Sequence, residues 1–219
     1  MTRKTGRYAA EGPETEFQPG SRGRVLRNLF GIRSARELAR AESRALLGAQ
    51  ERLVEMFSLE HRFTSSDVRE IHRAWLETIY PWAGQYRTVN IAKGDFHFAA
   101  AQEVPRLMSE FERNQLAQYT PCRFAAEREI AQALAIVHAE LVLIHPFREG
   151  NGRCARLLAL LMALQAGLPP LDFTGWTGRG GKVYIAAIHA AMAADYEPMI
   201  GLFSGVIHRS SGRFGRRGR

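Results

Sequence analysis

The chain has 219 residues, and its 46% hydrophobic content is enough for one domain with a sizeable core. No stretch reaches the roughly 18 apolar residues that a membrane span needs, and the polar N-terminus lacks a signal-peptide core, so we expect a cytoplasmic protein without a membrane partner. The two cysteines, Cys122 and Cys154, provide neither a disulfide framework nor the spacing of metal ligands.

The net charge of +8 is concentrated at the C-terminal end of the sequence. Residues 209–219 carry five arginines and no acid, which leaves the remaining residues only mildly basic. Basic segments spaced by glycine and serine are usually solvated, so we interpret 209–219 as a basic, disordered tail and do not expect nucleic acid as a partner. Binding of nucleic acid, membrane or an acidic protein by this tail stays the minority alternative.

A helical period dominates the chain and predicts an all-α fold. Residues 1–20 are polar and carry proline and glycine near their end, so we expect a flexible arm without a core. From Leu38 to Met56 apolar residues recur three or four apart, which predicts a first amphipathic helix. A second helix is predicted after Asp67, an N-cap with a glutamate three residues on, and it should end before Pro81.

One region, residues 87–99, is predicted as strand. Its apolar residues alternate on both sides of a turn, which predicts a small β-hairpin in a helical protein. The pattern alone leaves a decorative and a functional role equally open. The alternating residues are Val89, Ile91, Phe96 and Phe98, around the turn at 93–95.

The second half of the chain is predicted to contain the central helix of the fold. Ile130, Leu134, Val137, Leu141 and Ile144 are spaced four, three, four and three apart in an alanine-rich segment, which is typical of a buried helix. The expected domain spans residues 21–208. Further helices are predicted from about residue 104, over 153–165, over 182–194 and over 198–208.

The turn between the two best-predicted helices carries residues that suit phosphate. It reads HPFREGNGRCAR, residues 145–156. Gly150 and Gly152 permit backbone conformations that turn successive N–H groups inward, and the following helix adds its positive N-terminal end. Arg153 and Arg156 lie three apart on one helix face and can donate forked hydrogen bonds to a polyphosphate.

Other residues of this turn supply a base and a metal ligand. His145 stands at the C-terminal end of the preceding helix, whose dipole favours the imidazolium, so it can take a proton from a hydroxyl. Glu149 is a hard oxygen ligand suited to Mg²⁺, and Phe147 is expected to fill the core. Each feature alone is usually structural, but a base, a metal ligand, an N–H nest and two arginines within twelve residues indicate phosphoryl or nucleotidyl transfer.

The run 145–156 matches, at every defined position, the signature of the Fic family, H-P-F-x-[D/E]-G-N-G-R-x-x-R. The stretch WAGQYRTVNIAKGDFHFA resembles the flap segment of that family, and residues 25–33 resemble its N-terminal lead-in, so the resemblance covers roughly residues 20–205. It implies an all-α Fic-type helical bundle with a small β-hairpin flap. It also implies protein adenylylation (AMPylation), a nucleotidyltransferase reaction that uses ATP and Mg²⁺.

The resemblance implies a role for each residue of the motif. His145 would deprotonate the target hydroxyl, which attacks the α-phosphorus in line while pyrophosphate leaves. Glu149 would place Mg²⁺ between the α- and β-phosphates. The α-phosphate would be held by Asn151 and the N–H groups around Gly150 and Gly152, and the β- and γ-phosphates by Arg153 and Arg156.

The resemblance also implies a docking role for the hairpin. The flap residues Lys93, Gly94, Asp95 and Phe96 would clamp the target segment by strand-like pairing. Lys93 is as consistent with a solvated position as with a direct role. Tyr184 suits an adenine pocket, although a core aromatic at helical spacing with Ile188 is favoured.

Kinase activity and a catalytically silent binding role are the alternatives to adenylyl transfer. Doc-type kinases of the same superfamily carry a lysine where this chain has Gly152, which favours adenylyl transfer here. A catalytically silent basic binding module is disfavoured because the motif is intact.

The resemblance further suggests control by a partner. The inhibitory helix motif of the family, [S/T]-x-x-x-E-[G/N], is absent, because the only Glu-Gly pairs follow Arg7 and His145 by four residues. We therefore expect the toxin of a toxin–antitoxin pair and a separate small antitoxin that carries this motif. The first guess for the target protein is a bacterial type II topoisomerase subunit.

Overall fold

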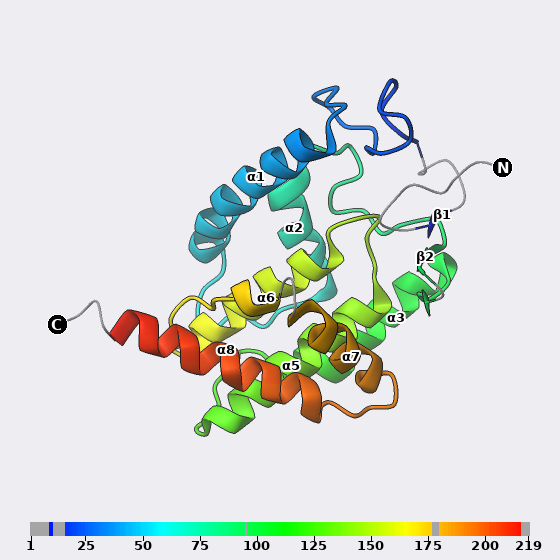
Figure 1. The fold of residues 1–219 in the computed structure, drawn as a ribbon. Coiled ribbons are helices and arrows are strands. Elements are labelled where there is room, and N and C mark those ends of the chain that lie inside the picture. The colour runs from blue at the N-terminus through cyan, green and yellow to red at the C-terminus, as the bar shows by residue number, and fades with distance from the viewer. Residues whose placement is uncertain (1–8, 11–15, 95, 177–179, 216–219) are drawn as a thin grey trace. The chain divides into compact units, whose positions relative to one another are not determined.

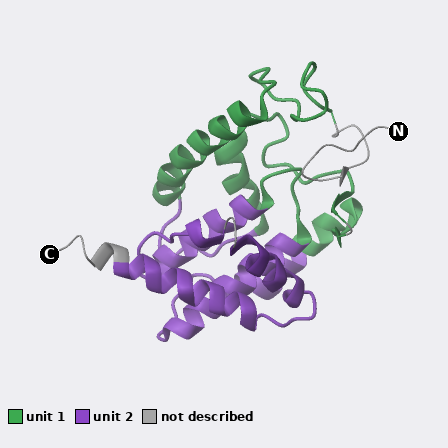
Figure 2. Cartoon of the chain, in the orientation of Figure 1, with its two compact units in different colours: residues 1–56, 65–108, 144–151 green, residues 57–64, 109–143, 152–219 purple. Residues whose placement is uncertain are grey.

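The computed structural model describes residues 9–10, 16–94, 96–176 and 180–215, and Figure 1 shows their helices and small sheet. The chain forms two compact units, which Figure 2 colours separately. Unit 1 consists of residues 1–56, 65–108 and 144–151. Unit 2 consists of residues 57–64, 109–143 and 152–219. The predicted domain of residues 21–208 thus includes residues of both units.

Unit 1 contains two helices that pack on each other, α1 (Ala35–Met56) and α2 (Ser65–Leu76). Both predicted helices are confirmed, but α2 begins two residues before Asp67, which lies in its first turn and is not the N-cap. Trp75 donates its indole N–H to the carbonyl of Glu42, 2.9 Å away, and so joins the two helices. The apolar side chains buried on these helices include Leu38, Ala49, Leu53, Val68, Ile71 and Trp75.

The predicted hairpin is confirmed and is part of a three-stranded antiparallel sheet in unit 1. Its strands are β2 (Ile91–Lys93) and β3 (Phe96–His97), with Ala92 opposite His97. A further strand, β1 (Ala9–Ala10), pairs with the other side of β2. The segment 1–20 was predicted as a flexible arm without a core, yet β1 and a bridge from Phe17 to Leu26 pair parts of it with other segments of unit 1.

A helical stretch without a break follows the sheet. It consists of a 3₁₀ turn η2 (Ala101–Glu103), α3 (Val104–Phe111), a π-helical turn η3 (Glu112–Leu116) and α4 (Ala117–Tyr119). The helix predicted from about residue 104 therefore begins as expected. Met108, Phe111 and Leu116 are buried, as the apolar spacing of the segment predicts.

Unit 2 contains most of α5 (Glu127–Ile144), which is largely buried, as predicted. It also contains α6 (Asn151–Gln165), the 3₁₀ turn η4 (Thr174–Trp176), α7 (Gly180–Ala191) and α8 (Glu197–Gly215). The buried core includes Leu134, Val137, Leu141, Leu158, Met162, Phe203 and Val206. Among the described residues, no helix is both long and apolar enough to cross a membrane.

Helix α8 extends seven residues past the predicted end at His208, into the segment predicted as a disordered tail. Ser210 explains part of the difference, because it is fully buried. Its hydroxyl donates to the carbonyl of Val206 (2.8 Å) and accepts the N–H of Asp172 (2.9 Å). Composition predicts a solvated tail here, whereas one buried serine anchors the helix.

Candidate active site

The predicted motif starts directly after α5 and continues into the first turns of α6, as expected for a helix, turn, helix arrangement. Residues 145–151 belong to unit 1, and residues 152–156 lie on the first turns of α6 in unit 2.

The side chain of Asn151 closes the turn in unit 1. Its Oδ1 accepts the N–H of Phe147, and its Nδ2 donates to the carbonyl of the same residue, both at 2.8 Å. Asn151 is buried, so these two bonds fix the orientation of its side-chain amide. The structure thus adds a structural role to the phosphate contact predicted from the resemblance.

Gly150 is required by the backbone of the turn. Its φ is +85°, a left-handed conformation that side chains disfavour, and a Cβ would lie 2.7 Å from Cζ3 of Trp75. Trp75 is buried and cannot yield, so the conformational argument made for this glycine is confirmed.

His145 directly follows α5 and adopts a left-handed backbone, with φ of 53°. Such a conformation is uncommon outside glycine, and it marks the histidine as strained. His145 is 4% exposed, and the ring of Phe98, which follows β3, stacks on its imidazole at 3.7 Å and 25°. The flap segment and the predicted base are therefore in direct contact within unit 1.

Two further residues of unit 1, His72 and Arg87, support the turn and were not predicted from the sequence. Nδ1 of His72 accepts the N–H of Gly84 (2.9 Å), so the neutral ring carries its proton on Nε2 and donates it to the carbonyl of Glu149 (3.1 Å). The ring of Phe147, which is fully buried as predicted, stacks on His72 at 3.8 Å and 12°. Arg87 donates through Nε to the carbonyl of His145, 2.7 Å away.

Glu149 is the metal ligand that the sequence predicts. Its Oε1 accepts the N–H of Gly150 (3.0 Å), which orients the carboxylate. The part of the chain that the structure describes holds no group of three or more His, Cys, Asp or Glu side chains arranged for a metal ion. Mg²⁺ commonly uses one or two carboxylates together with phosphate oxygens, so Glu149 fits such an ion when a nucleotide supplies the other ligands.

The second part of the motif starts α6 in unit 2. Gly152 has a helical backbone without a positive φ, so the conformational reason given for it from the sequence is wrong. A Cβ at this position would lie 3.8 Å from Nη1 of Arg156 and 4.0 Å from the hydroxyl of Tyr184, which is ordinary contact. The arginine and the tyrosine thus border the open side of Gly152. Arg153 is half-buried on the same first turn.

Tyr184 packs in a cluster of aromatic side chains in unit 2. It stacks on Trp176 at 5.0 Å and 28°, and its hydroxyl is 2.9 Å from Nε2 of His138. This placement agrees with the favoured core role of Tyr184. Burial, and next the positive charge of Arg156, lower the pKa of His138 to about 3, so this imidazole is neutral.

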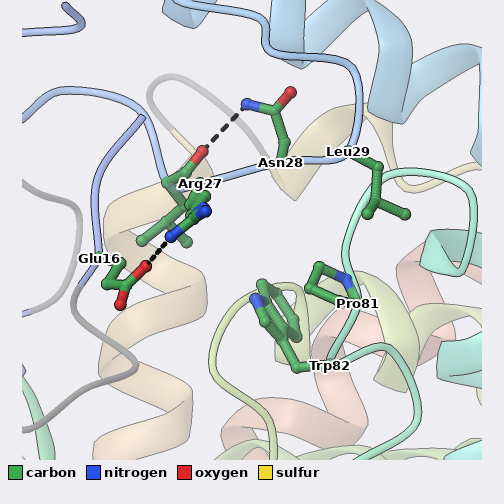
Figure 3. A pocket seen from close by; sticks show the side chains of 7 residues that line it. Glu16, Arg27, Asn28, Leu29, Pro81 and Trp82 are labelled. Atoms are coloured by element: carbon green, nitrogen blue, oxygen red, sulfur yellow. Dashed lines mark hydrogen bonds and ion pairs between the residues drawn. The ribbon is translucent and has the colours of Figure 1, made fainter. Parts of the chain in front are cut away.

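A separate pocket in unit 1 involves the lead-in segment. Figure 3 shows it between Trp82 and the strip from Leu26 to Leu29, with an ion pair of Glu16 and Arg27 at 2.5 Å. Asn28 holds this strip by donating to the carbonyls of Leu26 and Ile32. None of the predicted site residues lines this pocket.

Comparison with known proteins agrees with this fold and motif. Residues 62–163 match the model of the Fic/DOC family. The chain is 30% identical over 204 residues to a probable protein adenylyltransferase Fic of Salmonella typhimurium, and the match covers 90% of this chain and 94% of that protein. The fold is that of Fic domains, and the chain belongs to the Fic/DOC family.

Other relatives share the domain but are longer. Protein adenylyltransferase VbhT of Bartonella schoenbuchensis is 32% identical over 155 residues, which are 71% of this chain and 31% of that protein. The chain spans about a third or less of the length of several curated relatives that it matches. The fold is shared with a crystal structure of the BepC effector of Bartonella tribocorum with bound AMPPNP, at a TM-score of 0.66 and 22% identity. The superposed region covers 83% of this chain and 91% of that one.

Proposed function

We propose that this protein is a protein adenylyltransferase that transfers AMP from ATP to a Tyr, Thr or Ser hydroxyl of a target protein. The observation that supports this most is the turn after α5, which holds His145 in a left-handed conformation under Phe98 and ends in the first turn of α6. The relatives that carry the same domain are named protein adenylyltransferases.

The imidazole of His145 accepts the proton of the target hydroxyl, whose oxygen forms a bond to the α-phosphorus of ATP. The bond from that phosphorus to the bridging oxygen breaks, and pyrophosphate leaves. Arg153 and Arg156 stabilise the charge that develops on the departing phosphates.

The phosphates are proposed to approach α6 at its N-terminal end, where main-chain N–H groups and the helix dipole favour an anion. The open side of Gly152, bordered by Arg156, suits that approach. Glu149 would hold Mg²⁺, which when bound neutralises charge on the phosphate oxygens.

The hairpin is proposed to dock the target segment through main-chain pairing. Lys93 and Gly94 are exposed at its turn, and Gly94 has φ of +60° with no neighbouring atom within 4 Å of an added Cβ. Phe96 packs edge-on against Phe98 at 4.9 Å, so the hairpin is continuous with the ring that covers His145. Asp95 lies outside the described residues.

The test uses purified protein, a bacterial lysate and two labelled forms of ATP. Transfer of AMP predicts that label from α-labelled ATP stays on a protein band and that label from γ-labelled ATP does not. The opposite pattern would show a kinase and refute the proposal. His145→Ala is the control, and it should abolish labelling while ATP still binds, because the base is needed for chemistry alone.

We further propose that the protein acts in the cytoplasm as the toxin of a toxin–antitoxin pair. The partner would be a small antitoxin with the [S/T]-x-x-x-E-[G/N] motif, whose glutamate pairs with Arg156. A bacterial type II topoisomerase subunit is the first target to test. Expression of the chain alone should then arrest bacterial growth, and the His145→Ala form should not.

A further inference from the structure

Arg87 is a buried cation whose side chain is bonded to main-chain carbonyls. Arg87 is only 2% exposed. Nε donates to the carbonyl of His145 (2.7 Å), Nη1 to Val89 (2.9 Å) and Nη2 to Ala99 (2.5 Å). A buried charge is costly unless its donors are used, so these bonds are needed to keep the guanidinium in this position.

Two of these carbonyl acceptors lie at the two ends of the flap hairpin. Val89 precedes β2 and Ala99 follows β3, so the terminal nitrogens of one guanidinium hold both ends. The base of the hairpin is closed further by the N–H of Phe98, which donates to the carbonyl of Ile91 (3.2 Å).

The remaining acceptors lie at the predicted base. Nη2 also approaches the carbonyl of Ile144 (3.5 Å), and the main-chain N–H of Arg87 donates to the carbonyl of Pro146 (2.8 Å). Together with the bond to His145, Arg87 thus holds three successive carbonyls around a residue with a left-handed backbone. Strained conformations of this kind persist only where the surroundings enforce them.

We propose that Arg87 is a positioning residue of the transfer reaction, which couples the flap hairpin to the backbone of His145. Arg87 thereby fixes the position of the target segment on the hairpin relative to the base that takes its proton. This inference rests on the proposed function. Lysine cannot replace this arginine. The three N–H groups of lysine all belong to one nitrogen, whereas the planar guanidinium of arginine reaches carbonyls on both sides.

The test compares Arg87→Lys with Arg69→Lys. Arg69 belongs to the same unit, donates to one carbonyl, that of Gly84 (2.9 Å), and lies over the ring of Tyr86, but it does not bond the hairpin. Arg87→Lys should lower kcat for the protein target by about 10²-fold, the cost of a misplacement of about 1 Å. The affinity for ATP should stay at the wild-type value, and Arg69→Lys should change neither quantity.

A second measurement does not depend on activity. The amide of Phe98 is hydrogen-bonded in the hairpin base, and the amide of Phe147 is hydrogen-bonded in the turn. In Arg87→Lys, hydrogen–deuterium exchange should become faster at both amides. In Arg69→Lys, exchange should be unchanged at both. Faster exchange at only one of the two sites, or unchanged exchange with full transfer, would overturn the coupling. Equal losses of ATP affinity and transfer would assign Arg87 a structural role and also overturn it.

Failure of the proposed function gives a different result. In that case wild-type protein transfers no AMP, whereas the paired change in exchange is still measured in Arg87→Lys. If Arg87→Lys does not fold, Phe98→Leu carries the test, because it weakens the contact between the hairpin and His145 without touching the buried cation. Reduced transfer at unchanged ATP affinity supports the coupling, and unchanged transfer contradicts it.

Discussion

The two glycines of the motif should respond in opposite ways to alanine. At Gly152 the backbone is helical, and the nearest atoms to an added Cβ are at 3.8 and 4.0 Å, so alanine fits the free protein. Alanine is also the better helix former, by about 1 kcal/mol at interior positions. Gly152→Ala should therefore leave the free energy of unfolding unchanged or raise it by up to about 1 kcal/mol.

The same change should damage function. The added methyl group would occupy the open side of the helix start, beside Arg156, where the phosphates are proposed to approach. A shift of the nucleotide by about 1 Å costs roughly 10²-fold in rate, so Gly152→Ala should lose at least this much transfer activity. A glycine that lowers stability but leaves space for a ligand is expected at a binding site.

Gly150→Ala is the comparison. The left-handed backbone costs an ordinary residue about 1 to 2 kcal/mol, and the 2.7 Å approach to Trp75 adds an overpacking penalty of about 1 to 3 kcal/mol. The sum is roughly 2 to 5 kcal/mol, and at about 2 to 4 °C per kcal/mol for a chain of this size the melting temperature should fall by roughly 4 to 20 °C.

Thermal unfolding, ATP titration calorimetry and transfer of α-labelled ATP would be measured on both variants. Unfolding of Gly152→Ala at a temperature as low as that of Gly150→Ala would contradict an open position at residue 152. Wild-type ATP binding and AMP transfer by Gly152→Ala would contradict the proposed approach of the phosphates there.

The pKa of His138 falls on folding from an ordinary 6.5 to about 3, so between pH 6.5 and pH 3 only the unfolded chain takes up this proton. The free energy of unfolding should therefore fall with falling pH in this range, by up to about 1.4 kcal/mol per pH unit. Denaturant titrations of His138→Gln should lack this contribution. Burial raises the pKa of Cys122 to about 12 and raises that of Cys154 as well, so a thiol reagent at pH 8 should label neither in folded protein and both in urea; rapid labelling of the native chain would contradict the buried placement. Glu149→Ala should lower transfer roughly 10²- to 10³-fold at saturating Mg²⁺, and an unchanged rate and Mg²⁺ dependence would remove it as the metal ligand.

Much of the fold could be predicted because apolar spacing reports helices directly. The stripe from Ile130 to Ile144 predicts α5, and the alternation around residues 93–95 predicts the hairpin. The family could be predicted from the twelve-residue motif. Boundaries were less predictable, since α2 starts before Asp67 and α8 is prolonged by the buried Ser210.

The support of the site could not be predicted, because it depends on contacts between distant segments. His72 bonds the carbonyl of Glu149, 77 residues away, and Arg87 bonds that of His145, 58 residues away. A single sequence shows a histidine on a helix and an arginine before a strand, and both are usually solvated or structural. The reason for Gly152 was equally hidden, because it depends on the space beside Arg156 and Tyr184 and not on the local backbone.

The place of β1 in the sheet has a consequence for access to the hairpin. A strand can accept a new neighbour only at an unoccupied edge. β1 takes one edge of β2, through Ala9 opposite Ala92 and Ala10 opposite Ile91, so among the described strands β3 is the outer one on the other side. A target segment that pairs with β2 must first displace residues 9–10, whereas one that pairs with β3 need not. With only two residue pairs to break, the chain's own strand would compete weakly with an incoming target and delay its docking without preventing it.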